Sequence, residues 1–405
     1  MDSTTTSTTQ LFTSSTILST ILASTAIAIS LDEFKSKYLW VIIAGFATSF
    51  LLGFGMGSND VANAFGTSVG SKVLSLKQAN IMATLMETAG AALVGYNVVD
   101  TVRKSIVEIS LYQNEPEILL VGQVAILGGC SCWLVIATLF RLPVSSTHSI
   151  VGATLGFTLS MKGDKGIHWR FFFFFLHFIF LINSTRNPFK SGLRVLPLFY
   201  FLCFSYYTFM VLFEGSRAPK GIMRWFIPRR DRKEDQKTLR LFSIIQIVTG
   251  CFAGFSHGAS DVSHTIAPLV AMLSIYNTMS VFQESDTPLW MMFYGVSGTC
   301  FGFWMLGQRV MTTIGKKITD INPCNGFAIE FGMAITVLCA SKLGIPISTT
   351  HCLVGSVMFV GLIKAGEGVD WKVLINVALS WIVTLPASAA FSAGIMWLLN
   401  TAFLK

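Results

Sequence analysis

The sequence predicts an all-α, polytopic membrane protein built from two repeated halves. The first observation is composition: 52% of the 405 residues are hydrophobic and only 12% are charged, which excludes an ordinary water-soluble domain. The second is a series of apolar stretches that reach or approach the roughly 20 residues needed to span a bilayer as helix. The third is that two polar motifs each occur twice, in the same order. Because a backbone in lipid must satisfy its own hydrogen bonds, we expect about 10–12 helical transmembrane segments.

Composition divides the chain into four segments. Residues 1–37 form a Ser/Thr-rich N-terminal tail and a weak first span, without the basic start of a secretory signal. Residues 38–214 form the first transmembrane repeat, and residues 241–405 form the second. The segment 215–240 joins the two repeats.

The joining segment carries much of the net charge of +8. Between Arg217 and Arg240 there are nine Lys or Arg residues against three Asp or Glu residues. The positive-inside bias places such a loop in the cytoplasm, and we therefore expect no nucleic-acid partner. The eight cysteines are scattered, mostly through apolar runs, which indicates neither a disulfide framework nor a metal-binding quartet.

Comparison of the chain with itself shows a duplication. The stretch GSNDVANAFGTSV at 57–69 aligns without gaps to GASDVSHTIAPLV at 258–270. LPVSSTHSIVGA at 142–153 aligns in the same way to IPISTTHCLVGS at 345–356. The offsets are 201 and 203 residues, so two homologous halves are the economical explanation. Repeated halves are typical of transporters with a substrate site near the midplane, although channels also contain repeats.

The first motif pair places one aspartate inside an apolar run of each half, Asp60 and Asp261. A carboxylate at that depth is costly unless it is paired, hydrated or bound to a cation. No Lys or Arg lies within ten residues N-terminal of either aspartate, which favours a bound cation over a local salt bridge. Helical spacing gives the two acids matching polar neighbours on one face: Asn59 and Asn63 in the first half, Ser260 and His264 in the second.

Oxygen-rich side chains of this kind suit a hard cation, and glycines nearby would permit an unwound turn there. We therefore predict cation sites at Asn59 and Asp60 and at Ser260 and Asp261. The alternative is that these side chains only join helices by hydrogen bonds. A nucleotide-binding loop fits poorly because Gly53, Gly55 and Gly57 do not match G-x-G-x-x-G.

The second motif pair, PVSSTH at 143–148 and PISTTH at 346–351, puts a proline and three hydroxyl residues before an apolar run. This pattern is typical of a helix start, where hydroxyls and free backbone N–H groups lie at the positive end of the helix dipole. Two such starts at mid-depth could clasp one tetrahedral oxyanion from opposite sides. Ordinary N-capping is the alternative. The predicted anion ligands are Ser145, Ser146 and Thr147 in one half and Ser348, Thr349 and Thr350 in the other.

Carboxylates and an oxyanion would repel each other without cations between them, so cation-coupled anion symport follows as a physical expectation. His148 and His351 end the hydroxyl motifs and could carry protons, but a structural role is the simpler interpretation. Glu87 and Glu330 also lie in apolar runs and are candidates for transport-important acids.

These motifs closely resemble the inorganic phosphate transporter (PiT) family, the sodium-dependent phosphate symporters, particularly its animal members. The resemblance covers most of residues 38–170 and 190–405. It implies two inverted-topology repeats with broken helices or helical hairpins, alternating access, inorganic phosphate as substrate and sodium as coupling ion. It assigns phosphate and sodium ligation to Asp60, Asn63, Asp261 and the six hydroxyls, with Asn63 taken as a phosphate ligand, and importance for transport to Glu87 and Glu330.

One segment departs from the family pattern. SWIVTLP at 380–386 has no counterpart in the first half, where residues 171–186 instead hold a phenylalanine-rich run. The apolar part of this segment is too short to cross a bilayer comfortably, so we expect an altered topology there. The sequon at Asn183 lies within the same atypical segment.

The sequence thus predicts a multi-pass plasma-membrane symporter that imports inorganic phosphate with sodium. We expect no enzymatic activity and no cofactor beyond the transported ions, because no activated-nucleophile pattern accompanies the Ser, His and Asp residues. A phosphate-binding receptor or sensor, a proton-coupled phosphate transporter and a passive anion channel are the alternatives. A homodimer in the lipid bilayer also remains open.

Overall fold

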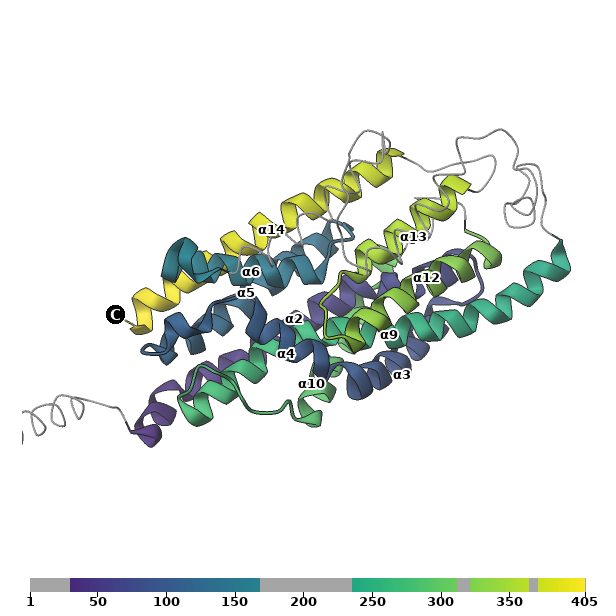
Figure 1. Cartoon of the computed structure of the whole chain (residues 1–405). Helices are drawn as coiled ribbons and strands as arrows, with labels where there is room; N and C mark the ends of the chain where they lie inside the picture. Colours follow the sequence, from purple (N-terminus) through teal and green to yellow (C-terminus); the bar gives the residue numbers. More distant parts are fainter. Residues whose placement is uncertain (1–29, 168–234, 312–320, 364–370, 405) are drawn as a thin grey trace, which may run out of the picture.

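The computed structural model describes residues 30–167, 235–311, 321–363 and 371–404, and this part of the chain is helical without a β-strand. Figure 1 shows a bundle of long helices, most of them roughly aligned. The first half contains α2 (Leu31–Gly70), α3 (Leu76–Val94), α4 (Tyr96–Ser105), α5 (Pro116–Leu139) and α6 (Ser146–Lys162). The second half contains α9 (Gln236–Thr278), α10 (Leu289–Leu306), α12 (Pro323–Lys342), α13 (Thr349–Ile363) and α14 (Trp371–Leu399). Short turns of helix lie at Ile109–Tyr112, Gly163–Gly166 and Asn400–Leu404.

Six of the described helices are long and apolar enough to cross a membrane. They are α2, α5, α9, α10, α12 and the C-terminal helix that contains α14. The prediction of an all-α polytopic membrane protein is confirmed. The tail up to residue 29, the atypical segment 171–186 with its sequon, and most of the basic loop 215–240 lie outside the described residues, so the predictions made for them remain predictions.

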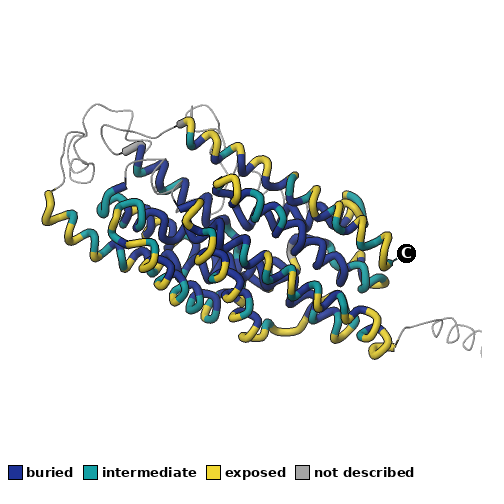
Figure 2. The backbone as a smooth tube through the Cα atoms, turned by 180° about the vertical axis from the view of Figure 1, so that it is seen from behind, coloured by how far each residue is buried: buried dark blue, intermediate teal, exposed yellow. Residues whose placement is uncertain are grey.

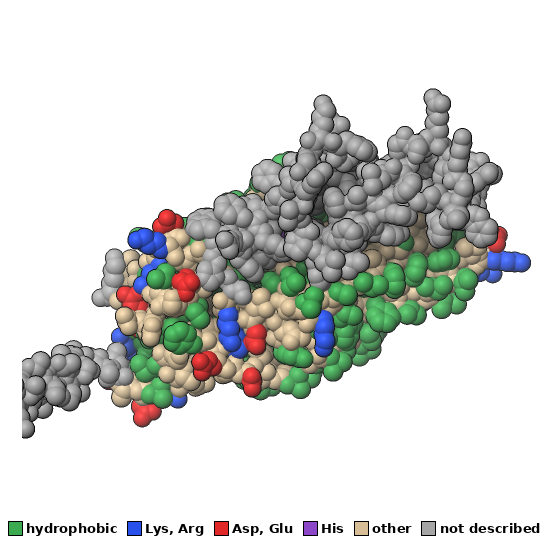
Figure 3. All heavy atoms as spheres, viewed as in Figure 1, with side chains coloured by type: hydrophobic (Ala, Val, Ile, Leu, Met, Phe, Trp, Pro, Cys, Tyr) green, Lys and Arg blue, Asp and Glu red, His purple; other side chains and the backbone are tan. Residues whose placement is uncertain are grey.

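The surface of the bundle fits a lipid environment. Large apolar side chains on α10 are exposed, among them Trp290, Phe293, Phe301 and Trp304. Figure 3 shows hydrophobic side chains along the described flank of the molecule, while charged side chains gather mainly toward one end. Figure 2 shows the opposite pattern inside, where buried residues line the centre of the bundle.

The two longest helices, α2 and α9, pack against each other in opposite directions. The Tyr276 hydroxyl donates to the Lys35 carbonyl at 3.0 Å, and the Ser49 hydroxyl donates to the Thr265 carbonyl at 3.1 Å. At the other end the Ser71 hydroxyl binds the Gln246 side-chain oxygen at 2.9 Å. Residue numbers thus rise along α2 as they fall along α9, which Figure 1 also shows. Because these helices carry the matched aspartate motifs, the copies run antiparallel, as inverted repeats require.

Both aspartate motifs lie in unbroken helix, so the expectation of an unwound turn at their glycines is wrong. α2 and α9 continue through the motifs with regular helical structure. The glycines instead permit close helix packing. A Cβ added at Gly57 would lie 1.9 Å from the Thr299 carbonyl oxygen of α10, and one at Gly258 would lie 2.2 Å from the Glu87 carbonyl oxygen of α3. The backbones approach too closely there for any side chain.

These glycine contacts show that the two halves are interleaved. The first-half helix α3 packs on α9 of the second half, and the second-half helix α10 packs on α2 of the first half. The direct contact between α2 and its neighbour in sequence, α3, is much smaller. Each half therefore completes the packing of the other.

The helix breaks of this fold are two hairpins, α5–α6 and α12–α13, whose tips contain the hydroxyl motifs. In Figure 1 the two hairpins occupy opposite ends of the bundle. Their tips meet, because hydrogen bonds join residues 147 and 347 and residues 144 and 350. α14 packs along α5 and α6, and the Trp381 ring nitrogen donates to the Pro143 carbonyl at 3.2 Å. The hairpin tips are thus held inside the molecule rather than on its surface.

Candidate functional site

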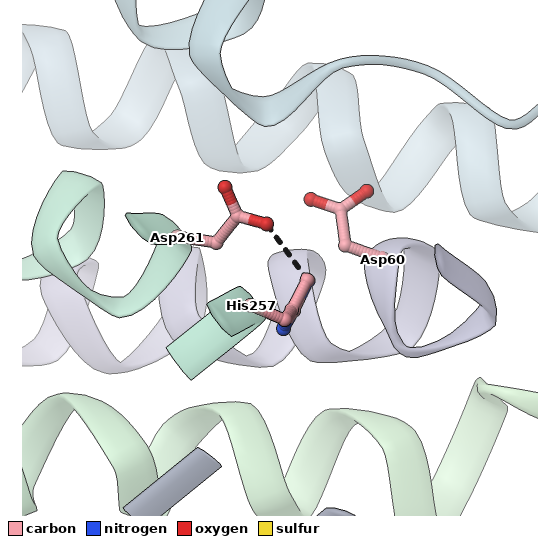
Figure 4. A group of neighbouring side chains, drawn as sticks. All are labelled: Asp60, His257 and Asp261. Carbon is pink, nitrogen blue, oxygen red and sulfur yellow. Dashed lines mark ion pairs between the residues drawn. The ribbon is translucent and has the colours of Figure 1, made fainter. Parts of the chain in front are cut away.

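The centre of the site is formed by Asp60 on α2 and Asp261 on α9, both fully buried. Their carboxylates lie on facing sides of the antiparallel helix pair, and Figure 4 shows them turned toward each other. One ligand atom each from Asp60, His257 and Asp261 can be chosen so that all lie within 4.8 Å of one another. The sequence predicted the two aspartates as a matched pair, and the fold brings them together.

His257 is the site residue that sequence analysis missed. Its Nε2 lies 2.8 Å from Asp261 Oδ2, and its Nδ1 lies 3.1 Å from Glu87 Oε1. All three side chains are buried. His257 therefore connects the predicted transport acid Glu87 to the aspartate pair. Its spacing of four residues from Asp261 was the available signal, since residues four apart share a helix face.

Several polar atoms at this centre have no hydrogen bond of ordinary geometry among the described residues, although the Ser146 hydroxyl lies beside Asp60. They include both carboxylate oxygens of Asp60, one oxygen of Asp261 and the Nε2 of His264. Nδ1 of His264 lies 3.6 Å from Asp261 Oδ1. Buried polar groups without partners are costly, and a carboxylate more so than a neutral group. The arrangement therefore suits ligands that carry charge.

Asn59 and Ser260, predicted as cation ligands, hold the hairpin loops. The Asn59 amide nitrogen donates to the Leu142 carbonyl at 2.9 Å, and its oxygen accepts from the Val144 N–H at 3.1 Å. The Ser260 hydroxyl lies 3.5 Å from the Ile347 carbonyl oxygen. Each long helix thus anchors the hairpin tip of its own half beside its own aspartate.

The first hydroxyl of each hairpin motif caps its own helix. Ser145 accepts from the N–H of His148 at 3.2 Å, and Ser348 accepts from the N–H of His351 at 3.2 Å. The same two hydroxyls lie 2.8 and 2.6 Å from Nδ1 of these histidines. The two imidazole rings then stack across the tips, with centroids 4.5 Å apart. N-capping is therefore a role that Ser145 and Ser348 do play.

The second hydroxyl of each motif faces the acids. The Thr349 hydroxyl donates to Asp261 Oδ2 at 2.7 Å, and the matching Ser146 hydroxyl lies beside Asp60. The Asn63 amide nitrogen donates to Thr349 Oγ1 at 3.2 Å and to Thr350 Oγ1 at 2.8 Å. Predicted cation ligands and predicted anion ligands therefore touch at this point.

The third hydroxyl of each motif crosses to the opposite hairpin. The Thr147 hydroxyl donates to the Ile347 carbonyl at 3.1 Å, and the Thr350 hydroxyl donates to the Val144 carbonyl at 3.1 Å. The backbone positions 144 and 347 match each other in the duplication, as do the two threonines. The contacts are therefore reciprocal.

Glu330 lies apart from the aspartate pair, in a polar cluster of its own. Its carboxylate accepts from the hydroxyls of Thr67 and Ser68 at 2.6 Å each, from Thr249 at 2.8 Å and from the Gln246 amide at 3.1 Å. Thr67 is seven residues along α2 from Asp60, about 10 Å by helical rise. Glu330 thus links α12 to both long helices instead of contacting the central acids.

The arrangement brings acids and anion-binding helix starts into one buried place. Two carboxylates from antiparallel helices lie against the N-termini of α6 and α13, which carry the positive ends of the helix dipoles. Helix starts attract anions and carboxylates attract cations. A site with both can hold an anion and a cation side by side.

Proteins similar to this chain in sequence include phosphate transporters. Residues 56–392 match the phosphate transporter family, PHO4. The sodium-dependent phosphate transporter 1-A of Danio rerio is 26% identical, over 94% of this chain and 98% of that protein. A putative phosphate permease of Haemophilus influenzae is 32% identical, over 92% of this chain and 100% of that protein.

A solved structure described as the sodium-dependent phosphate transporter resembles the fold with a TM-score of 0.71. It is 31% identical in sequence, and the match covers 89% of this chain and 99% of that one. The family match spans both aspartate motifs and both hydroxyl motifs that form the buried site. The chain therefore belongs to the phosphate transporter family.

Proposed function

We propose that this chain is a secondary active symporter that imports inorganic phosphate with sodium across the plasma membrane by alternating access. One observation carries the proposal: the hairpin tips with the duplicated hydroxyl motifs meet directly beside the buried pair Asp60 and Asp261. Family membership supports phosphate as the substrate, and the sodium-dependent relatives support the coupling ion.

In this proposal sodium is held by Asp60 and Asp261. Three buried carboxylates, Asp60, Glu87 and Asp261, lie close to the imidazole of His257. A second imidazole, that of His264, lies 3.6 Å from Asp261. Cations between the aspartates would offset the charge of these groups and would screen them from a bound anion. The oxygen ligands match the preference of hard cations. Asn59 and Ser260 support these positions from the same helices.

Phosphate is then held between the two helix starts. Asn63, Ser146 and Thr349 lie between the acids and the tips. The hydrogens that Asn63 gives to the two threonines and that Thr349 gives to Asp261 would turn to the oxyanion when phosphate binds. Backbone N–H groups at the starts of α6 and α13 add further donors. The hydroxyls of Ser145, Thr147, Ser348 and Thr350 are engaged within the hairpins, and their predicted role as phosphate ligands remains a prediction.

Proton-coupled phosphate transport is the second candidate, and His257 favours it. The imidazole lies between Glu87 and Asp261, in contact with both, and a proton carried there would replace part of a cation's charge. The two candidates share the phosphate site and differ only in the coupling ion.

Uptake of labelled phosphate tests the proposal. Cells that express the full chain are assayed in sodium medium and in choline medium, each at two pH values, with surface expression measured in parallel. Saturable uptake that needs sodium supports the symporter. Uptake that persists in choline and rises at acid pH supports proton coupling instead. Phosphate binding without saturable flux supports a receptor or sensor, and non-saturable flux without a cation requirement indicates an anion channel.

A further inference from the structure

We propose that Thr147 and Thr350 form a reciprocal latch that holds the two hairpin tips together beside the binding site. They would act as positioning residues for transport, distinct from phosphate ligands. The role that we give this latch in the transport cycle rests on the proposed function. The latch itself consists of hydrogen bonds between the two hairpins.

The first argument is symmetry. Thr147 and Thr350 are matched positions of the duplication, and so are their acceptors at Val144 and Ile347. Both hydroxyl-to-carbonyl distances are 3.1 Å. Matched positions about 200 residues apart in sequence therefore make the same contact, once in each half. A hydroxyl that only caps its own helix would show no such crossing.

The second argument is how each tip is anchored. The first tip is tied to α2 of its own half through Asn59, and the second approaches α9 of its own half through Ser260. Among the described residues, the threonine hydroxyls and the stacked rings of His148 and His351 join the two tips directly. The long helix α2 adds bonds from Asn63 to the second tip, and α14 adds one from Trp381 to the first. Movement of one half against the other would leave the Asn59 and Ser260 contacts intact. The same movement would break the threonine contacts.

The third argument is donor capacity. A threonine hydroxyl has one hydrogen to donate. In this arrangement Thr147 and Thr350 give that hydrogen to a backbone carbonyl, so neither can donate to an oxyanion at the same time. The neighbouring hydroxyls of Ser146 and Thr349 face the acids instead. The three hydroxyls of each motif therefore have three separate roles: helix cap, site and latch.

Hydrogen–deuterium exchange on the purified full chain in lipid nanodiscs tests the latch without phosphate present. Thr147→Val and Thr350→Val keep the shape of the side chain and remove the hydroxyl. Loss of one ordinary hydrogen bond shifts an opening equilibrium about three- to tenfold. Thr350→Val also removes the acceptor of the Asn63 amide, so its effect should be at least as large. We expect Thr147→Val to speed amide exchange by this factor at residues 347–349, and Thr350→Val to do so at residue 144. The effect thus appears in the hairpin that is not substituted.

Matched variants sharpen the test. Thr147→Ser and Thr350→Ser retain a hydroxyl and should exchange like the unaltered chain. Thr154→Val removes a buried hydroxyl of the same helix α6 whose bond, within the described residues, is to the Ile150 carbonyl of its own helix, and it should leave the second hairpin unchanged. Exchange that increases only in the substituted hairpin, or equally with Thr154→Val, would overturn the latch. So would an effect that needs bound phosphate, because that would indicate a ligand role.

Phosphate uptake by the unaltered chain, measured separately, keeps the two proposals apart. A cross-hairpin effect on exchange in a chain that takes up no phosphate would overturn the proposed function and leave the latch standing. Sodium-dependent uptake without any cross-hairpin effect would overturn the latch and leave the proposed function standing.

Discussion

Asp60 and Asp261 occupy matched positions of the duplication, but within the described residues only Asp261 has an imidazole in hydrogen-bond contact, that of His257 at 2.8 Å. Neither oxygen of Asp60 accepts a hydrogen bond of ordinary geometry within the described part of the chain. The residue that matches His257 in the first half is Met56, which can neither donate nor carry charge. The two halves are thus alike in backbone and unlike in charge. In the proposed symport, Asp60 would consequently be the acid that depends more on a bound cation.

Asp60→Asn is expected to reduce sodium-dependent phosphate uptake to background, because the amide removes the charge that would hold the cation. Asp261→Asn should do the same. Uptake of labelled phosphate in sodium and choline media, corrected for surface expression, is the measurement. Asp32→Asn, an exposed position at the start of the same helix as Asp60, is the matched control and should transport normally. Full activity in either site variant would contradict the cation sites.

His257→Ala is expected to destabilise the protein by about 3–5 kcal/mol, the usual cost of breaking a buried charged pair. The substitution leaves Glu87 and Asp261 buried with no group between them. Thermal unfolding of the purified chain measures the loss. Adding Glu87→Gln should restore part of the stability, because it removes one of the unbalanced charges. A double variant no more stable than the single one would argue against this network.

Glu330→Ala is expected to destabilise by more than Glu330→Gln does. Alanine leaves the hydroxyls of Thr67, Ser68 and Thr249 without their acceptor, at about 1–3 kcal/mol for each group left unsatisfied. Glutamine keeps one acceptor oxygen. Unfolding midpoints distinguish the two variants. Cys339→Ala at an exposed position of the same helix serves as control and should change stability little. Equal losses for alanine and glutamine would rule out this explanation.

Gly57→Ala and Gly258→Ala are each expected to prevent correct folding or to cost several kcal/mol. The added methyl would lie 1.9 or 2.2 Å from a backbone carbonyl oxygen on the neighbouring helix, and backbone cannot move aside as a side chain can. Gly355→Ala is the matched control, since nothing lies within 4 Å of its added carbon and α13 is regular helix there. It should be neutral or stabilise by about 0.5–1 kcal/mol. Surface yield and monodispersity in size-exclusion chromatography report the outcome.

The sequence predicted the parts of the site that the duplication repeats. Asp60 and Asp261 were found because an apolar run rarely holds a carboxylate and because the pattern occurs twice. The hydroxyl motifs were found as helix starts, and the structure places them there. Even the membrane class followed from composition alone.

The rest of the site depends on contacts that no pattern repeats. His257 has no polar counterpart in the duplication, because the residue that matches it in the first half is Met56, so the repeat gives no signal for this position. The separate location of Glu330 follows from which helices pack on α12, and spacing along the chain does not reveal this. Glycines beside a polar motif permit an unwound turn, whereas here the close approach of α3 and α10 requires them for packing.

The interleaving of α3 with α9 and of α10 with α2 has a consequence for biogenesis. When the ribosome has delivered residues up to 167, the surfaces of α2 and α3 that will meet α10 and α9 still face lipid or the insertion machinery. Domains usually fold in order of synthesis, but here the first half can complete its packing only after the second half has been made. Cellular quality control therefore has a long interval in which to recognise an unfinished chain. A nonsense mutation in the second half leaves α2 and α3 without the helices that pack against them.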